Sequence, residues 1–342
     1  MQVSTNHAMD KVLSWLLEPD PLNPGIRYFA LRDLLGLPRD EKELRIAQKE
    51  IMQTGPVPAI LDAQHPEGYW ARPGGGYTPS YTATIWQVIF LAELGADTSD
   101  ERVQRGCEYI LDHNLAANGG FSLNARPVPS SVVHCLNGDP LYALLKLGYG
   151  NDSRVQSALD WQVDAITGAG EVRFYKSGTS GMGFACAANL RQPCAWGATK
   201  ALKALSTIPP DNRSPAIVRS IEVGSSFLLD QDLAKAEYPY TERINSSWFN
   251  FGFPLSYRSD ILETMDVLVR LGFGDDSRLV NARELILGKR DDKGRWLMEK
   301  SLNRKMWVDI EKKGRPSKWI TMRAIRALGI RDFEQTGVDA RL

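Results

Sequence analysis

The feature of this 342-residue chain that most constrains its fold is an internal repeat. Residues 147–154 read LGYGNDSR and residues 271–278 read LGFGDDSR, and a looser copy begins at Leu94. In each copy an amphipathic run ends at Leu-Gly, and a second helical pattern follows within a few residues. Glycine is favoured just after a helix, and Asp or Ser at the start of the next one. The repeat therefore predicts pairs of helices joined by short turns.

Six such units, about 59 residues apart on average, account for nearly all of the chain. This period is longer than the roughly 34 residues of tetratricopeptide repeats, and it suits two helices and a long loop. The first helices are expected near 26–36, 81–94, 135–147, 194–205, 257–271 and 317–328. The second helices are expected near 40–53 with 57–64, 101–113, 153–166, 214–229 and 278–289. The first set is rich in Ala, Leu, Trp and Thr, whereas the second is more charged, as expected for helices with one face in solvent.

This pattern predicts an all-α fold, an (α/α)6 toroid in which buried inner helices are surrounded by outer ones. Residues 1–342 would form one barrel domain, with a small β-hairpin near 294–310. The repeats are expected at approximately 20–70, 77–123, 130–175, 190–240, 254–302 and 314–335. Closure of the ring would explain why the ends carry no clear polar capping repeat, which an open solenoid needs.

Charge and composition exclude several classes of protein. The chain has 41 basic and 41 acidic side chains, so a nucleic-acid partner bound through a dominant basic surface is not expected. No apolar run approaches the roughly 20 residues of a membrane-spanning helix, and the start is too polar for a secretion signal. Four cysteines without a CxxC pair do not suggest a disulfide scaffold. We therefore expect a cytoplasmic protein, and its oligomeric state is left open.

Loops after the outer helices carry a second signal. Residues 64–70 read QHPEGYW and fit the pattern Q-x3-G-x-W, and residues 290–296 fit it with Arg290 in place of glutamine. Residues 118–121, NGGF, are a degenerate version. These loops resemble the QW motif of the squalene and oxidosqualene cyclases and, more loosely, loops of the protein-prenyltransferase β subunits. The resemblance implies an α/α toroid in which the motif glutamine meets a helix end and Trp70 and Trp296 have structural roles.

The acid motifs of that superfamily are absent. Class II cyclases protonate their substrate with a D-x-D-D aspartate or the D-C-T-A-E variant, and neither string occurs here. The diphosphate-binding D-D-x-x-D of class I enzymes and the zinc-binding D-x-C of protein prenyltransferases are missing too. Function therefore has to be sought in the residues of this chain, because unrelated sites are built on one fold.

The N-terminal ends of the inner helices are expected to meet at one mouth of a central cavity. Candidate substrate-binding residues at this mouth are aromatic, amide or charged: Tyr77, Tyr81, Trp86, Asn137, Asp139, Trp248, Tyr257, Lys318 and Trp319. Aromatic rings facing the cavity would stabilise a carbocation, although core packing is the simpler role for any one of them.

His134, Cys135, Cys186 and Cys194 are candidate catalytic residues at the same mouth. A thiolate at a helix N-terminus is a competent base or nucleophile. A barrel lined by Cys and His is also similar to the linalool dehydratase-isomerases, which act on a small terpene alcohol without a metal. Zinc on Cys135, Cys186 and His134 is the alternative. The simpler interpretation is that the cysteines and the histidine are buried structural residues.

Asp260 and Glu263 complete the candidate catalytic set. They are three residues apart on one helix, so their carboxylates can approach each other, and such a pair raises one pKa. The simpler interpretation is a first-turn pair that complements the helix dipole.

Two classes of function follow. The first is a terpenoid-cyclase-like enzyme, a lyase or isomerase, that performs cyclisation, isomerisation or dehydration on an apolar, isoprenoid-like substrate without a cofactor. The second is a non-catalytic barrel that binds an apolar ligand or acts as a scaffold. A zinc-dependent prenyltransferase-like protein is a further alternative, and it would need a partner subunit.

Overall fold

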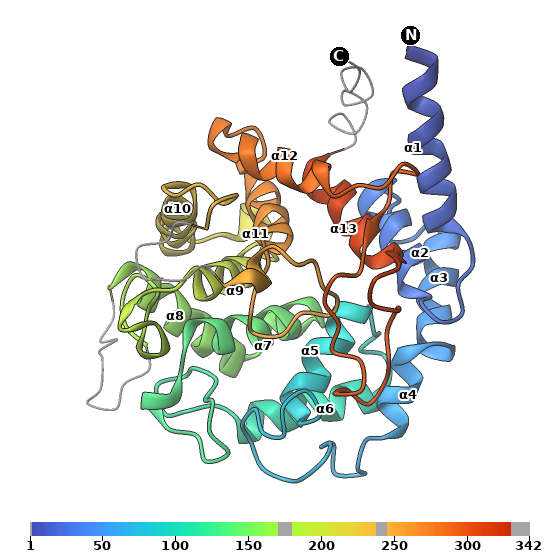
Figure 1. Ribbon diagram of the computed structural model, residues 1–342. Helices are drawn as coiled ribbons and strands as arrows, with labels where there is room; N and C mark the ends of the chain where they lie inside the picture. Colours follow the sequence, from blue (N-terminus) through green and yellow to red (C-terminus); the bar gives the residue numbers. More distant parts are fainter. Residues whose placement is uncertain (1, 170–179, 237–244, 330–342) are drawn as a thin grey trace.

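The computed structural model describes residues 2–169, 180–236 and 245–329, and within them the protein is a ring of helix pairs (Figure 1). The inner helices are α2 (Gly25–Phe29), α5 (Thr84–Leu94), α7 (His134–Lys146), α9 (Ala195–Leu205), α11 (Ile261–Leu268) and α13 (Lys318–Leu328). The outer helices are α3 (Lys42–Gln53), α4 (Pro56–Asp62), α6 (Glu101–His113), α8 (Ser153–Thr167), α10 (Pro215–Leu229) and α12 (Val280–Gly288). The all-α toroid expected from the repeats is confirmed.

Two features were not expected from the repeats. A helix at the N-terminus, α1 (Gln2–Leu17), contacts α2. The first inner helix is short because it continues as a π-helical turn, η1 (Ala30–Leu34), and α11 continues in the same way as η7 (Val269–Phe273). Single 3-10 turns are η2 (Pro129–Ser131), η3 (Tyr149–Asn151), η4 (Ala187–Asn189), η5 (Pro210–Asn212), η6 (Ser246–Trp248) and η8 (Ser277–Leu279). The predicted repeat ends at 175, 240 and 335 lie outside the described residues.

The repeated octets end one helix and start the next in the same way. Gly148 and Gly272 have φ angles of 88° and 97°, in the left-handed region that favours glycine. Asp152 and Asp276 then accept hydrogen bonds from the backbone N–H groups two residues later. The predicted helix stops and caps are therefore confirmed, and they set the direction of each outer helix.

The two motif loops attach each outer helix to the next inner helix. The Trp70 indole N–H donates to the carbonyl oxygen ten residues earlier, and its backbone N–H donates to the Thr84 hydroxyl. Trp296 repeats both bonds, with Thr321 as the acceptor of its backbone N–H. Gln64 donates to a carbonyl oxygen in the first turn of α6 at 2.9 Å. Both tryptophans are fully buried and have structural roles.

The ring closes where α2 meets α5 and α13. A Cβ added at Gly25 would lie 2.7 Å from the Leu94 carbonyl oxygen and 2.9 Å from the Trp319 ring, so only glycine fits between them. The Trp319 indole N–H donates to the Asn23 side chain, which precedes α2. The first and last units of the sequence are thereby joined.

Short strand pairs accompany the ring. β1 (Ala185–Cys186) pairs antiparallel with β2 (Gln192–Pro193), and β3 (Trp296–Leu297) with β4 (Pro316–Ser317). A β-hairpin was expected within 294–310, but the second strand, at 316–317, lies beyond this range. The second strand lies beside the start of α13 because Trp296 is anchored to that helix through Thr321.

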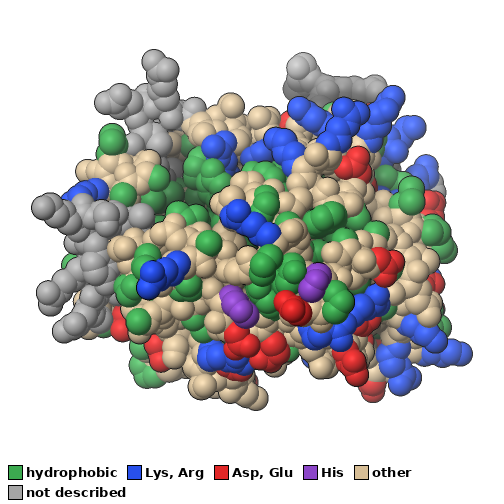
Figure 2. Space-filling model, turned by 90° about the horizontal axis from the view of Figure 1, so that it is seen from below, with side chains coloured by type: hydrophobic (Ala, Val, Ile, Leu, Met, Phe, Trp, Pro, Cys, Tyr) green, Lys and Arg blue, Asp and Glu red, His purple; other side chains and the backbone are tan. Residues whose placement is uncertain are grey.

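The surface carries both signs of charge. Figure 2 shows acidic and basic side chains interspersed on one face, in keeping with a net charge of zero over the chain. Among the described helices, none combines the length and the apolar character needed to cross a membrane.

Candidate functional site

Three of the four cysteines meet at the N-terminal ends of α7 and α9, and we call Cys135, Cys186 and Cys194 the thiol cluster. Cys135 is the second residue of α7, Cys186 ends strand β1, and Cys194 is the N-cap of α9. Cys135 interacts electrostatically with both other thiols. All three are free and only partly buried. The prediction that they gather at this mouth of the ring agrees with the structure.

Cys186 is the ionisable member of the cluster. A hydrogen bond from the Cys194 thiol and bonds from the backbone N–H groups of Ala188 and Asn189 lower the pKa of Cys186 to about 6. The same bond to Cys186, together with burial, raises the pKa of Cys194 well above its ordinary value. Burial raises the pKa of Cys135 to about 12. The thiol cluster therefore holds one thiolate and two thiols near neutral pH.

Asp139 lies one turn along α7 from Cys135, on the same side of the helix. Its carboxylate is 3.1 Å from the Lys200 ammonium group, and both side chains are 1% exposed. Burial raises the pKa of Asp139 to about 6 even though Lys200 opposes the shift. Asp139 is therefore a buried acid whose pKa lies near neutrality, close to the thiol cluster.

A glycine brings Asp139 and Lys200 together. A Cβ added at Gly138 would lie 2.6 Å from the Lys200 carbonyl oxygen, so α7 and α9 approach to backbone contact at this point. A Cβ added at Gly197, one turn earlier on α9, would lie 3.1 Å from the His134 Cβ and 3.7 Å from that of Cys194. Two glycines thus set the separation of the helices that carry the site.

Lys200 also belongs to a set of buried charges at the centre of the ring, the central charge network: Glu93, Asp139, Lys200, Lys203 and Glu263. Lys200 lies 3.1 Å and Lys203 2.9 Å from Glu263, and Lys203 also pairs with Glu93. Burial opposes the ionisation of Glu263, but the two ammonium groups hold its pKa below the usual range. Three carboxylates and two cations are thereby desolvated together, which demands that each stays paired.

The predicted acid pair is corrected by these contacts. Asp260 is the N-cap of α11, and its carboxylate accepts the backbone N–H groups of Glu263 at 2.7 Å and of Gly252 at 3.2 Å. Burial raises the pKa of Asp260, against the opposing effect of Arg323. Glu263, however, is held as a carboxylate by its lysines and is unsuited to proton donation. The capping interpretation therefore describes Asp260, and an ion-pair role describes Glu263.

His134 is also corrected, because both of its ring nitrogens are used structurally. Nε2 lies 2.8 Å from the Gly181 carbonyl oxygen, and Nδ1 lies 2.9 Å from the Gln162 side-chain amide. Burial lowers the pKa of His134 to about 4, so the ring is neutral. A zinc ion on His134, Cys135 and Cys186 would break one of these bonds. Within the described residues, no three His, Cys, Asp or Glu side chains form a group that could hold a metal ion.

Three of the predicted substrate-binding residues form hydrogen bonds or ion pairs with other residues of the protein. The Asn137 side-chain oxygen accepts a hydrogen bond from the Phe121 backbone N–H, and its amide N–H donates to the side-chain oxygen of Gln162 in α8. The Trp248 indole N–H donates to a backbone carbonyl oxygen at 2.9 Å. Lys318 pairs with Asp20 at 3.6 Å. Each of these contacts joins elements of the fold.

Three of the predicted aromatic residues form one group. Tyr77 and Tyr81 pack around Trp86 with ring centroids 5.2 and 5.0 Å away, and the Tyr77 hydroxyl donates to the Leu136 carbonyl oxygen. Burial and nearby Asp139 raise the pKa of Tyr77, so this phenol is neutral.

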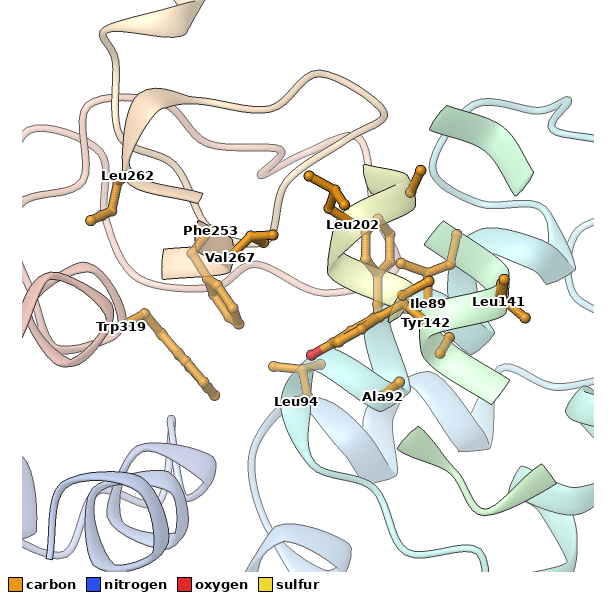
Figure 3. Close-up of a cluster of buried hydrophobic side chains, with 14 of the residues drawn as sticks. Ile89, Ala92, Leu94, Leu141, Tyr142, Leu202, Phe253, Leu262, Val267 and Trp319 are labelled. Atoms are coloured by element: carbon orange, nitrogen blue, oxygen red, sulfur yellow. The ribbon is translucent and has the colours of Figure 1, made fainter. Parts of the chain in front are cut away.

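Trp319 and its neighbours fill the centre of the ring. Trp319 stacks on Phe253 at 4.0 Å, and Figure 3 shows both rings facing Tyr142 across the centre of the ring. Tyr142, Phe253 and part of the central charge network line a cavity of about 20 Å³, room for about one water molecule.

Tyr257 lies partly exposed near the start of α9. Its ring is 6.5 Å from that of Trp196, which is two residues after Cys194, and the Arg258 guanidinium lies 5.5 Å from the Trp196 centroid. Half-buried aromatic rings near the thiol cluster can contact an apolar molecule without displacing a buried ion pair.

Glu93, Lys200 and Lys203 were not among the residues predicted from the sequence. Each interrupts an otherwise apolar inner helix, as in the stretches IWQVIFLAEL and ATKALKAL. A charged residue on a helix that is buried on all sides has to be paired, so this interruption was the available signal.

Neither a comparison with protein-family models nor a search of curated proteins found a match. Similar solved structures include the type II terpene cyclase MstE from Scytonema, 15% identical, covering 96% of this chain and 98% of that one, with a TM-score of 0.44. A variant of that cyclase in complex with its substrate, geranylgeranyl dihydroxybenzoate, is 14% identical over 97% and 98% of the chains, with a TM-score of 0.46. A protein from Actinoplanes is 16% identical over 96% and 99%, with a TM-score of 0.44.

Proposed function

We propose that this chain is an enzyme that performs acid–base chemistry, an isomerisation, dehydration or cyclisation, on an apolar, isoprenoid-like molecule. The observation that carries the proposal is the proximity of Asp139, a buried acid, to the thiol cluster, which holds a thiolate. Cys135 interacts electrostatically with both Asp139 and Cys186, so acid and base share one neighbour. Both have pKa values near the pH at which an acid–base catalyst works best.

Asp139 is the proposed acid. It donates its proton to a hydroxyl oxygen or an alkene carbon of the substrate, and the carboxylate left behind is stabilised by Lys200 at 3.1 Å. In a dehydration the protonated hydroxyl leaves as water. Because Lys200 is already in place, little reorganisation is needed when the charge forms.

Cys186 is the proposed base. Its thiolate accepts a proton from a carbon next to the cationic centre, which forms a double bond and neutralises the substrate. The proton then returns from the thiol to the Asp139 carboxylate through solvent, so the enzyme is regenerated. Cys194 is the proposed positioning residue, because its thiol hydrogen bond stabilises the thiolate.

The half-buried aromatic residues Trp196 and Tyr257 are the proposed binding surface for the apolar part of the substrate. The central cavity of about 20 Å³ is much too small for an isoprenoid. We therefore assign substrate binding to the mouth of the ring beside the thiol cluster, where the side chains are partly exposed.

The test is incubation of the purified protein with prenyl alcohols, prenyl diphosphates and squalene, followed by mass spectrometry of the products. We expect turnover of at least one compound, lost in Asp139→Asn and Cys186→Ser and retained in Cys107→Ala, whose thiol lies in outer helix α6. Thermal stabilisation by a compound without any product would instead indicate a non-catalytic binding protein. Absence of both turnover and stabilisation would reject the proposal.

A further inference from the structure

A second cavity, of about 520 Å³, lies at the opposite end of the inner helices from the thiol cluster. Its lining includes the C-terminal ends of α5 and α7 and the residues that follow α9 and α11. Helix α7 runs from His134 beside the thiol cluster to Lys146 in this cavity, a distance of roughly 18 Å at 1.5 Å per residue. The two sites are therefore separate.

Five cationic side chains line this cavity, and we call it the cationic pocket: Arg32, Arg39, Arg45, Lys146 and Arg270. Asp97 is the only carboxylate among the described lining residues. Two further carboxylates, Asp33 and Asp266, pair with Arg32 and Arg270 at 2.5 and 3.7 Å, and both are also bound by Arg326 at 2.8 and 2.7 Å. The pocket therefore keeps an excess of positive charge.

Lys146 has no carboxylate partner within 4 Å in the part of the chain that the structure describes. Its ammonium group lies 4.6 Å from the centroid of the Phe29 ring and 5.6 Å from that of Tyr142. Burial and the nearby Arg32 lower the pKa of Lys146 to about 7. A bound anion would restore its charge.

Helix capping explains part of this charge and leaves the rest unexplained. Lys146 is the last residue of α7 and Arg270 follows α11, and cations are favoured at such C-terminal ends by the helix dipole. Arg39, however, precedes α3, and Arg45 lies in its first half, where that dipole does not favour a cation. The two arginines are exposed, and no described carboxylate pairs with them.

We infer that the cationic pocket binds a small multivalent oxyanion, a phosphate ester or a polycarboxylate. Guanidinium groups bind such oxygens in pairs of parallel hydrogen bonds. The volume is in the range of small-molecule sites, and Leu44, Ala92 and Leu145 provide an apolar wall for a carbon skeleton. The site belongs to a second ligand, distinct from the substrate proposed for the thiol cluster.

The test is calorimetric titration of the full chain with pyrophosphate and with citrate at low salt. The double variant Arg39→Gln, Arg45→Gln should weaken binding about tenfold or more. The matched control, Lys42→Gln, Lys49→Gln, removes the same charge from two positions of α3 that do not line the pocket, and it should bind as the wild type does.

A third variant, Lys146→Met, tests the buried end of the pocket and should also weaken binding while the melting temperature is maintained. Tighter binding of pyrophosphate identifies a phosphate ligand, and tighter binding of citrate a polycarboxylate. No binding of either ion, or equal losses in the two double variants, would overturn the inference.

Discussion

The Lys200 ammonium group lies 3.1 Å from the Asp139 carboxylate, and each side chain is only 1% exposed. This contact joins α7 to α9 and connects the thiol cluster to the central charge network. Lys200 also pairs with Glu263 of α11, so one cation holds carboxylates from two inner helices. The same cation stabilises the folded ring and favours the charge that Asp139 acquires after proton donation.

Replacing Lys200 by Met should lower the free energy of unfolding by about 3–5 kcal/mol, because it leaves buried carboxylates without this partner. Urea denaturation at pH 7 measures the change. The control is Lys42→Met at an exposed position, which should change stability by about 0.5 kcal/mol or less. Equal effects of the two variants would contradict the assigned role of Lys200.

Alkylation of Cys186 by iodoacetamide should be half-maximal near pH 6, because the Cys194 thiol and two backbone N–H groups stabilise the thiolate. Peptide mass spectrometry follows each cysteine separately. Cys194→Ala removes the donor and should move the midpoint towards the ordinary value of about 8.5, whereas Cys194→Ser keeps a donor and should move it less. A midpoint that is the same in all three proteins would show that Cys194 has no such effect.

The pH dependence of kcat/KM should be bell-shaped with its maximum near pH 6. The thiolate of Cys186 forms as pH rises through about 6, and the acid form of Asp139 is lost over the same range. Rates measured from pH 4 to 9 on a compound turned over by the wild type provide the profile. Cys194→Ala should shift the acidic limb upward, and a flat profile would be inconsistent with the acid–base pair.

Asp139→Asn should change how stability depends on pH between about 4 and 6. The raised pKa of Asp139 makes its contribution favourable at low pH, and this contribution is lost as pH rises through about 6. His134 acts oppositely, since its lowered pKa removes stability as pH falls through about 4. The free energy of unfolding of the variant, relative to that of the wild type, should therefore increase by on the order of 2–3 kcal/mol from pH 4 to pH 7.

Chemical denaturation across this pH range tests the sign. The exposed Asp40→Asn variant serves as a control and should keep the pH dependence of the wild type. A variant at Asp139 that parallels the wild type at every pH would mean that this carboxyl group titrates alike in the folded and unfolded chains.

Thr84→Val and Thr321→Val should each destabilise the ring by about 1–3 kcal/mol, because each removes the hydroxyl that accepts the buried backbone N–H of Trp70 or Trp296. The two sites are in different loops, so their effects should add in the double variant. Thr98→Val, at the rim of the cationic pocket, is a control that should have little effect. A loss of stability in only one of the two threonine variants would show that the two loops do not stabilise the ring equally.

The ring of helix pairs could be predicted because its signals are local. Gly148 and Gly272 end helices through their own backbone conformation, and Asp152 and Asp276 cap helices two residues ahead. A run of a few residues contains all of this information. The mouth at which Cys135, Cys186 and Cys194 meet could be predicted as well, because it follows from the positions of the helix starts.

The role of each residue within that mouth could not be predicted in this way. His134 and Glu263 have suitable chemistry, but the partners that hold their side chains, Gln162 and Lys200, lie 28 and 63 residues away. A helical pattern shows which residues are enclosed, without showing which ones touch across the ring.

The sequence by itself therefore determined the helices, their order and the closed ring, because periodicity, stops and caps act over a few residues. Tertiary structure decided which carboxylate keeps its proton, which thiol loses one, and where cationic side chains gather. The physical reason is that a pKa depends on burial and on charges brought close by packing. Gly138 illustrates the link: a missing Cβ lets two helices touch, and that contact places Lys200 beside Asp139.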